Sequence, residues 1–245
     1  MAYYHCLLLD ADNTLLDFEA TEHKALLETF AEFEVPAEEE TLEQYHQINK
    51  GLWAALDRGE IRIDRLATER FVRLGQTLGL RLDAARMEKV YQDNLAKHAD
   101  LLPGALEAVR ELSEVATLAI VSNGFERVQT SRLALSGLDR YMDGVFISEK
   151  VGAAKPNRRV FEAALNALGV ENRDKVLVVG DSLRTDILGG SRAGLHTCWL
   201  NADGAEPEGG VQPTYTITRL EELYPIVMEE EELLNVGAKN RKHQI

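Results

Sequence analysis

The feature that most constrains the fold is an alternation of two kinds of segment in the second half of the chain. From Pro103-Gly104 onward, stretches with helical spacing of apolar residues separate apolar runs that are too short to be helices. The expected strands lie at 116–121, 145–147, 176–179 and 197–200, and the expected helices begin near residues 104, 125, 157 and 184. Tyr4 to Leu9 forms one more expected strand. This alternation predicts an α/β fold in which a Rossmann-like parallel sheet carries helices on both faces.

The segment between the first strand and residue 100 does not fit the alternation. It is too long for one crossover, and its apolar residues recur at helical intervals, as in Leu26, Phe30 and Phe33. We therefore expect a helical cap domain inserted after the first strand. The predicted organisation is a Rossmann-like core from residues 1–16 and 100–230, a helical cap from 17–99, and a C-terminal tail from 231–245.

The composition excludes several classes of partner. The chain has 245 residues and a net charge of −14, which disfavours binding to nucleic acid or to an anionic membrane surface. No stretch approaches the roughly 20 apolar residues that span a bilayer. The N-terminus has no basic segment or cleavage site typical of a signal peptide, and Cys6 and Cys198 lie in apolar runs without metal-ligand spacing. A cytoplasmic location is expected, and the oligomeric state is left open.

Two carboxylates follow the first expected strand. Asp10 and Asp12 are separated by one residue, so both side chains can face the same way as the chain leaves the strand. One carboxylate can then attack as a nucleophile while the other protonates a leaving group. The alternative is a pair of turn aspartates that cap a helix. The pattern favours the chemical interpretation.

Three further polar clusters follow expected strands or lie between them. Ser122-Asn123-Gly124 offers a hydroxyl and successive backbone N–H groups that can hold phosphate oxygens, although it also suits an ordinary turn. Lys155 precedes a proline and can be aimed at a phosphate, although a surface lysine is the commoner meaning. Asp181, in the segment Gly180 to Asp186, is a candidate magnesium ligand, and its alternative role is to cap the next helix.

The carboxyl ends of parallel strands meet at one edge of the sheet, so these clusters are expected to converge. If Asp10, Asp12, Asp181 and Asp186 lie together, each pair of like charges 4 Å apart costs about 4 kcal/mol at an effective dielectric constant near 20. Such a group requires a divalent cation and a lysine, for which Lys155 is the candidate. The sequence therefore predicts Mg²⁺ as cofactor, with Mn²⁺ as an alternative.

These residues also carry a family resemblance. The chain resembles the haloacid dehalogenase superfamily, whose phosphatases have the motifs DxDxT, S/T-N, K-P and GDxxxD in this order. The matching residues are Asp10-Ala11-Asp12-Asn13-Thr14, Ser122-Asn123, Lys155-Pro156 and Gly180-Asp181 to Asp186. The resemblance covers residues 4 to about 224. Asn13 replaces the glycine common in the superfamily, and asparagine also tolerates a left-handed backbone.

The resemblance implies a role for each matching residue. Asp10 is implied as the nucleophile and as a metal ligand. Asp12 is implied as the acid/base, with its backbone carbonyl on the metal, and Thr14 as the residue that positions Asp12. The carboxylate at position 12 distinguishes the chain from true dehalogenases, which lack it.

The remaining motif residues are implied in phosphate and metal binding. Ser122 and Lys155 are implied to bind the phosphoryl group, with Asn123 and Gly124 as further substrate-binding candidates. Asp181 is implied to ligate Mg²⁺. Asp186 is implied to act at the metal or on Lys155.

A closer resemblance concerns substrate. The chain looks like the bacterial house-cleaning pyrimidine 5'-nucleotidases of the superfamily, on the stretches 45–53, 147–152, 197–201 and 213–217. This implies hydrolysis of UMP, dUMP and dTMP. Trp53 and Phe18 are candidates for the base pocket, although an aromatic residue in an amphipathic helix is more often part of a core.

The sequence thus predicts a Mg²⁺-dependent phosphomonoester hydrolase that acts through an aspartyl-phosphate, most simply a pyrimidine 5'-nucleotidase with a small phosphorylated nucleotide as substrate. One alternative is a sugar-phosphate or phosphoglycolate phosphatase of the same superfamily. An alternative of another class is a non-catalytic phosphate-binding regulatory module, which normally lacks one of the two aspartates that are present here.

Overall fold

The structure, a computed structural model, describes residues 2–207 and 210–228, so the expected tail at 231–245 lies outside the described residues. Its described strands form one parallel sheet in the order β3-β2-β1-β4-β5-β6. The strands are β1 (Cys6–Leu9), β2 (Thr117–Ser122), β3 (Gly144–Ile147), β4 (Val176–Gly180), β5 (His196–Leu200) and β6 (Tyr215–Ile217). The predicted α/β fold with a Rossmann-like parallel sheet is confirmed. The strand order reverses between β1 and β4, and sheets of this kind bind their ligands at the carboxyl ends of the strands beside such a reversal.

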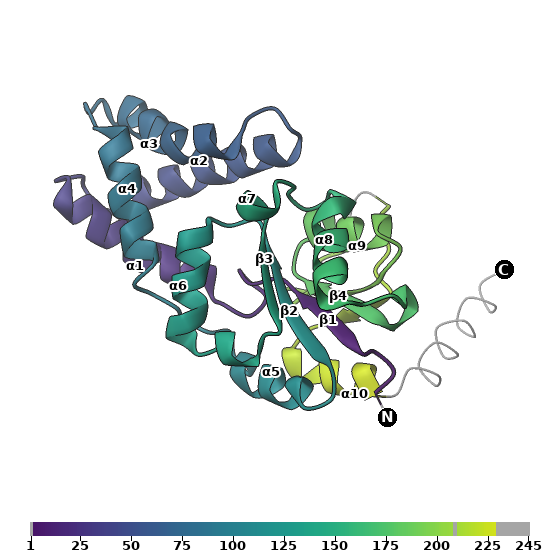
Figure 1. Cartoon of the computed structure of the whole chain (residues 1–245). Helices are drawn as coiled ribbons and strands as arrows, with labels where there is room; N and C mark the ends of the chain where they lie inside the picture. The colour runs from purple at the N-terminus through teal and green to yellow at the C-terminus, as the bar shows by residue number, and fades with distance from the viewer. Residues whose placement is uncertain (1, 208–209, 229–245) are drawn as a thin grey trace. The chain divides into compact units, whose positions relative to one another are not determined.

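Both faces of this sheet are covered (Figure 1). Successive residues of a strand point to opposite faces, and every residue of β1 and of β4 is buried, which is the pattern of a parallel sheet between helices. One core cluster joins Leu8 and Val178 of the sheet to Phe161 and Leu165 of α8. The α-helices that follow residue 100 are α5 (Ala105–Ser113), α6 (Glu126–Ser136), α7 (Ser148–Val151), α8 (Arg158–Leu168), α9 (Leu188–Arg192) and α10 (Leu223–Met228).

The described chain divides into two compact units. One contains residues 1–17, 101–126 and 136 onward, and the other contains 18–100 together with 127–135. The sequence had placed all of 100–230 with the sheet. Most of α6 is instead grouped with the helical unit, where Ser131 Oγ donates to the carbonyl oxygen of Ala96 (2.7 Å) and Arg127 pairs with Asp93 (2.7 Å).

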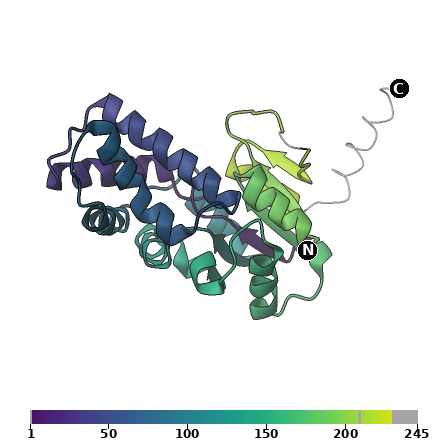
Figure 2. The same cartoon turned by 90° about the horizontal axis from the view of Figure 1, so that it is seen from above.

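The helical unit contains α1 (Phe18–Glu32), α2 (Glu39–Asp57), α3 (Ile63–Leu78) and α4 (Ala84–Leu95). Within it α1 packs on α4, α4 on α3, and α3 on α2 (Figures 1 and 2). Its interior holds an ion pair between Arg70 and Glu88, whose closest N–O distance is 2.8 Å. The guanidinium group of Arg70 also lies 4.6 Å from the ring centre of Tyr91. The buried Glu22 accepts hydrogen bonds from Tyr91 (2.7 Å) and Asn49 (3.0 Å).

The structure contains elements that the sequence did not predict. The short edge strand β6 adds a sixth strand. The expected helix from residue 184 is a π-helical turn, η3 (Leu183–Ile187), followed by α9. No helix of the described residues is both long and apolar enough to cross a membrane.

Candidate active site

The site is built around the ammonium group of Lys155. Its Nζ donates a hydrogen bond to Asp10 Oδ1 (2.6 Å) and lies 2.7 Å from Asp186 Oδ1. Asp10 immediately follows β1, Asp186 lies in η3, and Lys155 precedes α8. The side chains of Lys155 and Asp186 are only 3% and 1% exposed. Burial alone would lower the pKa of Lys155, but the carboxylates of Asp10 and Asp186 outweigh it and raise the pKa, so the lysine is charged.

A third carboxylate, from Asp181, completes this group. One carboxylate oxygen from each of Asp10, Asp181 and Asp186 lies within 4.8 Å of the other two. Burial, and next the charge of Asp186, raise the pKa of Asp181 to about 6. Burial also raises the pKa of Asp10; the nearby Lys155 opposes this increase, while Asp186 and Asp181 add to it. Three crowded carboxylates are the donor set that a hard divalent cation such as Mg²⁺ prefers, so these residues fit the expected metal.

The loop after β1 places Thr14 against Asp181. The backbone N–H of Asp181 donates to Thr14 Oγ1 (3.1 Å), and that hydroxyl donates to Asp181 Oδ1 (3.4 Å). Asn13 has a φ angle of 57°, as expected for asparagine in place of glycine. The carboxylate of Asp12 is not one of the three clustered groups, but its charge contributes to the raised pKa of Asp181, so it lies close to the same group. The expected role of Thr14 in positioning Asp12 stays a prediction.

The loop after β2 is attached to Lys155. The side-chain amide of Asn123 accepts a hydrogen bond from the backbone N–H of Lys155 (2.8 Å) and donates to its carbonyl oxygen (3.0 Å). Ser122 Oγ accepts from the backbone N–H of Gly124 (3.1 Å). The side chain of Asn123 thus holds the backbone that carries Lys155, a role that the local sequence pattern does not reveal. Whether Asn123 also binds substrate stays a prediction.

The π-helical turn η3 brings Asp186 back to the end of β4. Asp186 Oδ2 accepts a hydrogen bond from the backbone N–H of Ser182 (3.1 Å). This return is only possible because residue 180 is glycine. A Cβ atom there would lie 2.3 Å from Asp186 Cγ. Gly180 is the first residue of the motif Gly180-Asp181 to Asp186, but its steric role is visible only in the three-dimensional structure.

Phe18 and Trp53, the candidates for the base pocket, belong to the helical unit. Phe18 is the first residue of α1, and the guanidinium group of Arg132 lies 5.5 Å from its ring centre. Trp53 lies in α2 and is partly buried. Whether either residue contacts substrate stays a prediction.

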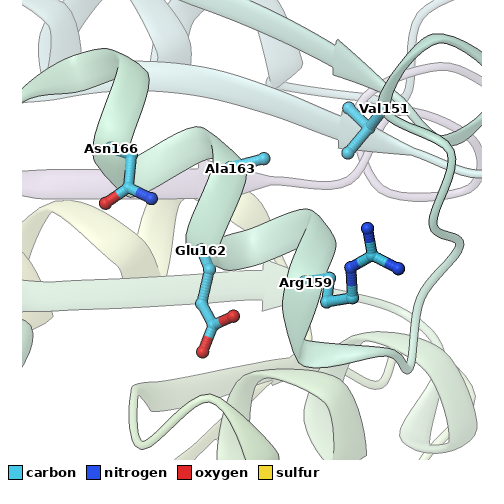
Figure 3. Close-up of a pocket in the computed structure, with 5 residues that line it drawn as sticks. All are labelled: Val151, Arg159, Glu162, Ala163 and Asn166. Atoms are coloured by element: carbon cyan, nitrogen blue, oxygen red, sulfur yellow. The ribbon is translucent and has the colours of Figure 1, made fainter.

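The sheet unit also has a surface pocket of about 250 Å³ beside α8 (Figure 3). Its lining consists of Val151, Arg159, Glu162, Ala163 and Asn166. None of the residues expected in the site lines this pocket, so the chemistry is assigned to the carboxylate group and not to the pocket.

Comparisons with known proteins agree with this geometry. The family model for haloacid dehalogenase-like hydrolases matches residues 4–194. The chain therefore belongs to the haloacid dehalogenase-like hydrolase family.

Several relatives are similar over nearly their full length. The chain is 36% identical to the pyrimidine 5'-nucleotidase YjjG of Escherichia coli, over 89% of this chain and 95% of the relative. It is 36% identical to the pyrimidine 5'-nucleotidase PynA of Streptococcus pneumoniae, over 90% and 94%. The crystal structure of YfnB from Bacillus subtilis bound to magnesium matches with a TM-score of 0.88 and 37% identity, covering 91% of this chain and 98% of that one.

The close approach at Gly180 generates a prediction. Replacing Gly180 with alanine should lower the free energy of unfolding by about 1–3 kcal/mol, the usual cost of overpacking, because the new methyl group displaces Asp186. It should also weaken Mg²⁺ binding. Urea denaturation and calorimetric Mg²⁺ titration measure the two effects.

Gly51→Ala is the matched control for this change. A Cβ atom at Gly51 meets nothing within 4 Å, so alanine in the interior of α2 should stabilise the protein by about 0.5–1 kcal/mol. If Gly180→Ala had the stability and the Mg²⁺ affinity of the wild type, the prediction would be wrong, because the added methyl group would then fit beside Asp186 without cost.

The raised pKa of Asp181 generates a second prediction. The folded protein binds the carboxyl proton of Asp181 more tightly than an unfolded chain does, because this carboxyl group titrates near 3.8 when the chain is unfolded. The stability that the proton contributes is therefore present below that pH and is lost as the pH rises through about 6. In metal-free buffer, the increase in melting temperature between pH 4 and pH 6 should therefore be smaller for the wild type than for Asp181→Asn. The apparent affinity for Mg²⁺ should increase over the same range because the cation displaces that proton. An affinity independent of pH between 5 and 7 would contradict this assignment.

Proposed function

We propose that this protein is a Mg²⁺-dependent phosphomonoesterase that hydrolyses pyrimidine nucleoside 5'-monophosphates through an aspartyl-phosphate on Asp10. The observation that carries the proposal is the contact of Asp10 with Lys155 (2.6 Å) beside the carboxylates of Asp181 and Asp186, with a second carboxylate two residues further on at Asp12. The names of the relatives YjjG and PynA support the choice of substrate class.

The first half of the reaction uses both aspartates of the first motif. A carboxylate oxygen of Asp10 attacks phosphorus, and the bond from phosphorus to the 5'-oxygen breaks. Asp12, in its protonated form, gives its proton to the departing 5'-oxygen, so the nucleoside leaves as a neutral alcohol. Lys155 and the loop from Ser122 to Gly124 bind the phosphoryl oxygens. When bound at the carboxylates, a divalent cation supplies positive charge that offsets the repulsion between Asp10 and the incoming phosphate.

The second half restores the enzyme. Asp12, now a carboxylate, takes a proton from a water molecule as that water attacks phosphorus. The bond between phosphorus and the Asp10 oxygen breaks, which releases inorganic phosphate and regenerates the Asp10 carboxylate. Asp12 ends protonated, ready for the next substrate.

Purified protein should release phosphate from UMP, dUMP and dTMP faster than from sugar phosphates or phosphoglycolate. EDTA should abolish release, and Mg²⁺ should restore it. Asp10→Asn should lose at least roughly 10⁴-fold in kcat because an amide cannot form the acyl-phosphate. Asp12→Asn should lose roughly 10²–10⁴-fold, the usual worth of general acid–base catalysis.

Asp139→Asn, at an exposed position in a 3₁₀ turn, is the control for charge removal and should match the wild type. Substantial turnover by Asp10→Asn would assign the nucleophile elsewhere. A preference for a sugar phosphate over UMP would retain the chemistry and reject the nucleotide substrate.

The choice of substrate is proposed to lie in the helical unit, since phosphate and metal contacts are the same for every phosphomonoester. If Trp53 stacks on the pyrimidine, Trp53→Ala should lose roughly 1–3 kcal/mol, which is about 5- to 150-fold in kcat/KM for UMP. The activity on p-nitrophenyl phosphate should change little, and Trp53→Phe should retain most of the UMP activity. Equal losses on both substrates would show that Trp53 is a packing residue.

A further inference from the structure

Strand β5 and the residue that follows it carry polar side chains, at Thr197, Trp199 and Asn201, that the proposed reaction does not use. In the structure each of three side chains makes a specific hydrogen bond. Thr197 exchanges hydrogen bonds with Thr214 (3.0 and 3.2 Å), and Asn201 exchanges two with the backbone of Ala205 (both 2.9 Å). These two connect β5 with the chain that follows it. The third side chain, Trp199, is directed to the site.

The indole of Trp199 holds the backbone of Asp181. Its Nε1–H donates to the carbonyl oxygen of Asp181 at 2.7 Å, and the side chain is only 5% exposed. The contact follows from the strand register, because Trp199 is paired with Gly180 at the last position of β4. Asp181 lies one residue beyond the end of β4, and a buried carbonyl group without a donor is costly. Trp199 supplies that donor.

Asp181 is thereby fixed at three points. Thr14 accepts from its backbone N–H and donates to its carboxylate, while Trp199 donates to its carbonyl oxygen. Bonds at both ends of the residue prevent rotation of the adjacent peptide groups. This direction of the backbone determines where the carboxylate of Asp181 points relative to Asp10 and Asp186.

We propose that Trp199 is a positioning residue that orients Asp181 for the divalent cation, so that metal affinity depends on the indole N–H. The inference rests on the proposed function, because it assumes that Asp10, Asp181 and Asp186 bind a cation. Groups that orient a metal ligand in this way typically change metal affinity roughly 10- to 100-fold when removed. In this role Trp199 acts through Asp181, by way of the hydrogen bond to its carbonyl oxygen.

The test measures Mg²⁺ binding to the full chain by calorimetry, independently of turnover. Trp199→Phe removes the N–H while keeping most of the buried apolar surface, and it should weaken Mg²⁺ binding roughly 10- to 100-fold. Thr197→Val is the matched control. It removes a hydrogen bond of the same buried strand, the one that Thr197 Oγ1 accepts from the backbone N–H of Thr214. It should lower the melting temperature in metal-free buffer but change Mg²⁺ affinity less than twofold.

A second measurement needs no change at Trp199. In protein labelled with ¹⁵N-tryptophan, the two indole N–H signals are assigned from the spectrum of Trp53→Phe. The Trp199 signal should shift on Mg²⁺ addition to the wild type and should stay fixed in Asp181→Ala.

The outcomes separate this inference from the proposed function. Wild-type Mg²⁺ affinity in Trp199→Phe, an equal loss in Thr197→Val, or a Trp199 signal that does not respond to bound Mg²⁺ would each overturn the role of Trp199 alone. Absence of Mg²⁺ binding by the wild type, or unchanged binding in Asp181→Ala, would overturn the proposed metal site and this inference together.

Discussion

The pairing of the buried Lys155 with the partly buried Asp10 and the buried Asp186 is the interaction on which the site depends. Lys155 lies between Asp10 and Asp186, and Asp181 adds a third carboxylate to the same group. With all three ionised and one lysine beside them, the group has an excess of two negative charges. At an effective dielectric constant near 20, each pair of like charges 4 Å apart costs about 4 kcal/mol. In the proposed reaction a divalent cation supplies the missing charge, and only then can a phosphate approach Asp10 without strong repulsion.

The fold creates this arrangement by bringing distant segments to neighbouring strand ends. Because β1 and β4 are adjacent where the strand order reverses, Asp10 and Asp181 leave the sheet side by side. The π-helical turn after β4 returns Asp186 to the same place, and Gly180 leaves the space that Asp186 occupies. Asn123, at the end of β2, holds the backbone of Lys155. The lysine is thus connected to three strand ends through hydrogen bonds and ion pairs.

Much of this could be predicted from the sequence, and the remainder depends on contacts that local patterns do not encode. Apolar runs identified five strands of the sheet, and the polar residues that follow β1, β2 and β4 predicted where the site lies. The sequence does not predict β6 because this strand has only three residues, Tyr215 to Ile217, and pairs only at the edge of the sheet. Hydrogen bonds such as those from Asn123 to Lys155 and from Trp199 to Asp181 join residues 32 and 18 positions apart, so only the folded chain reveals them. The grouping of residues 127–135 with the helical unit has the same cause, because it arises from contacts such as Ser131 with Ala96.

The net charge of −14 raises the question of how such a protein binds a phosphate, and the burial of the site answers it. At physiological ionic strength, interactions between exposed charges decay over about 8 Å, so most of the surface carboxylates have little effect on a phosphate at the strand ends. The charges of Lys155 and Asp186 are almost wholly buried and are screened far less. In the proposed function, local charge therefore decides phosphate binding, and the proposed cation has two effects. It neutralises the carboxylates, and it makes the site attractive to an anion. It follows that a substitution on the surface can change the net charge by several units with little effect on phosphate affinity, whereas a single change at Lys155 alters the balance that the whole site requires.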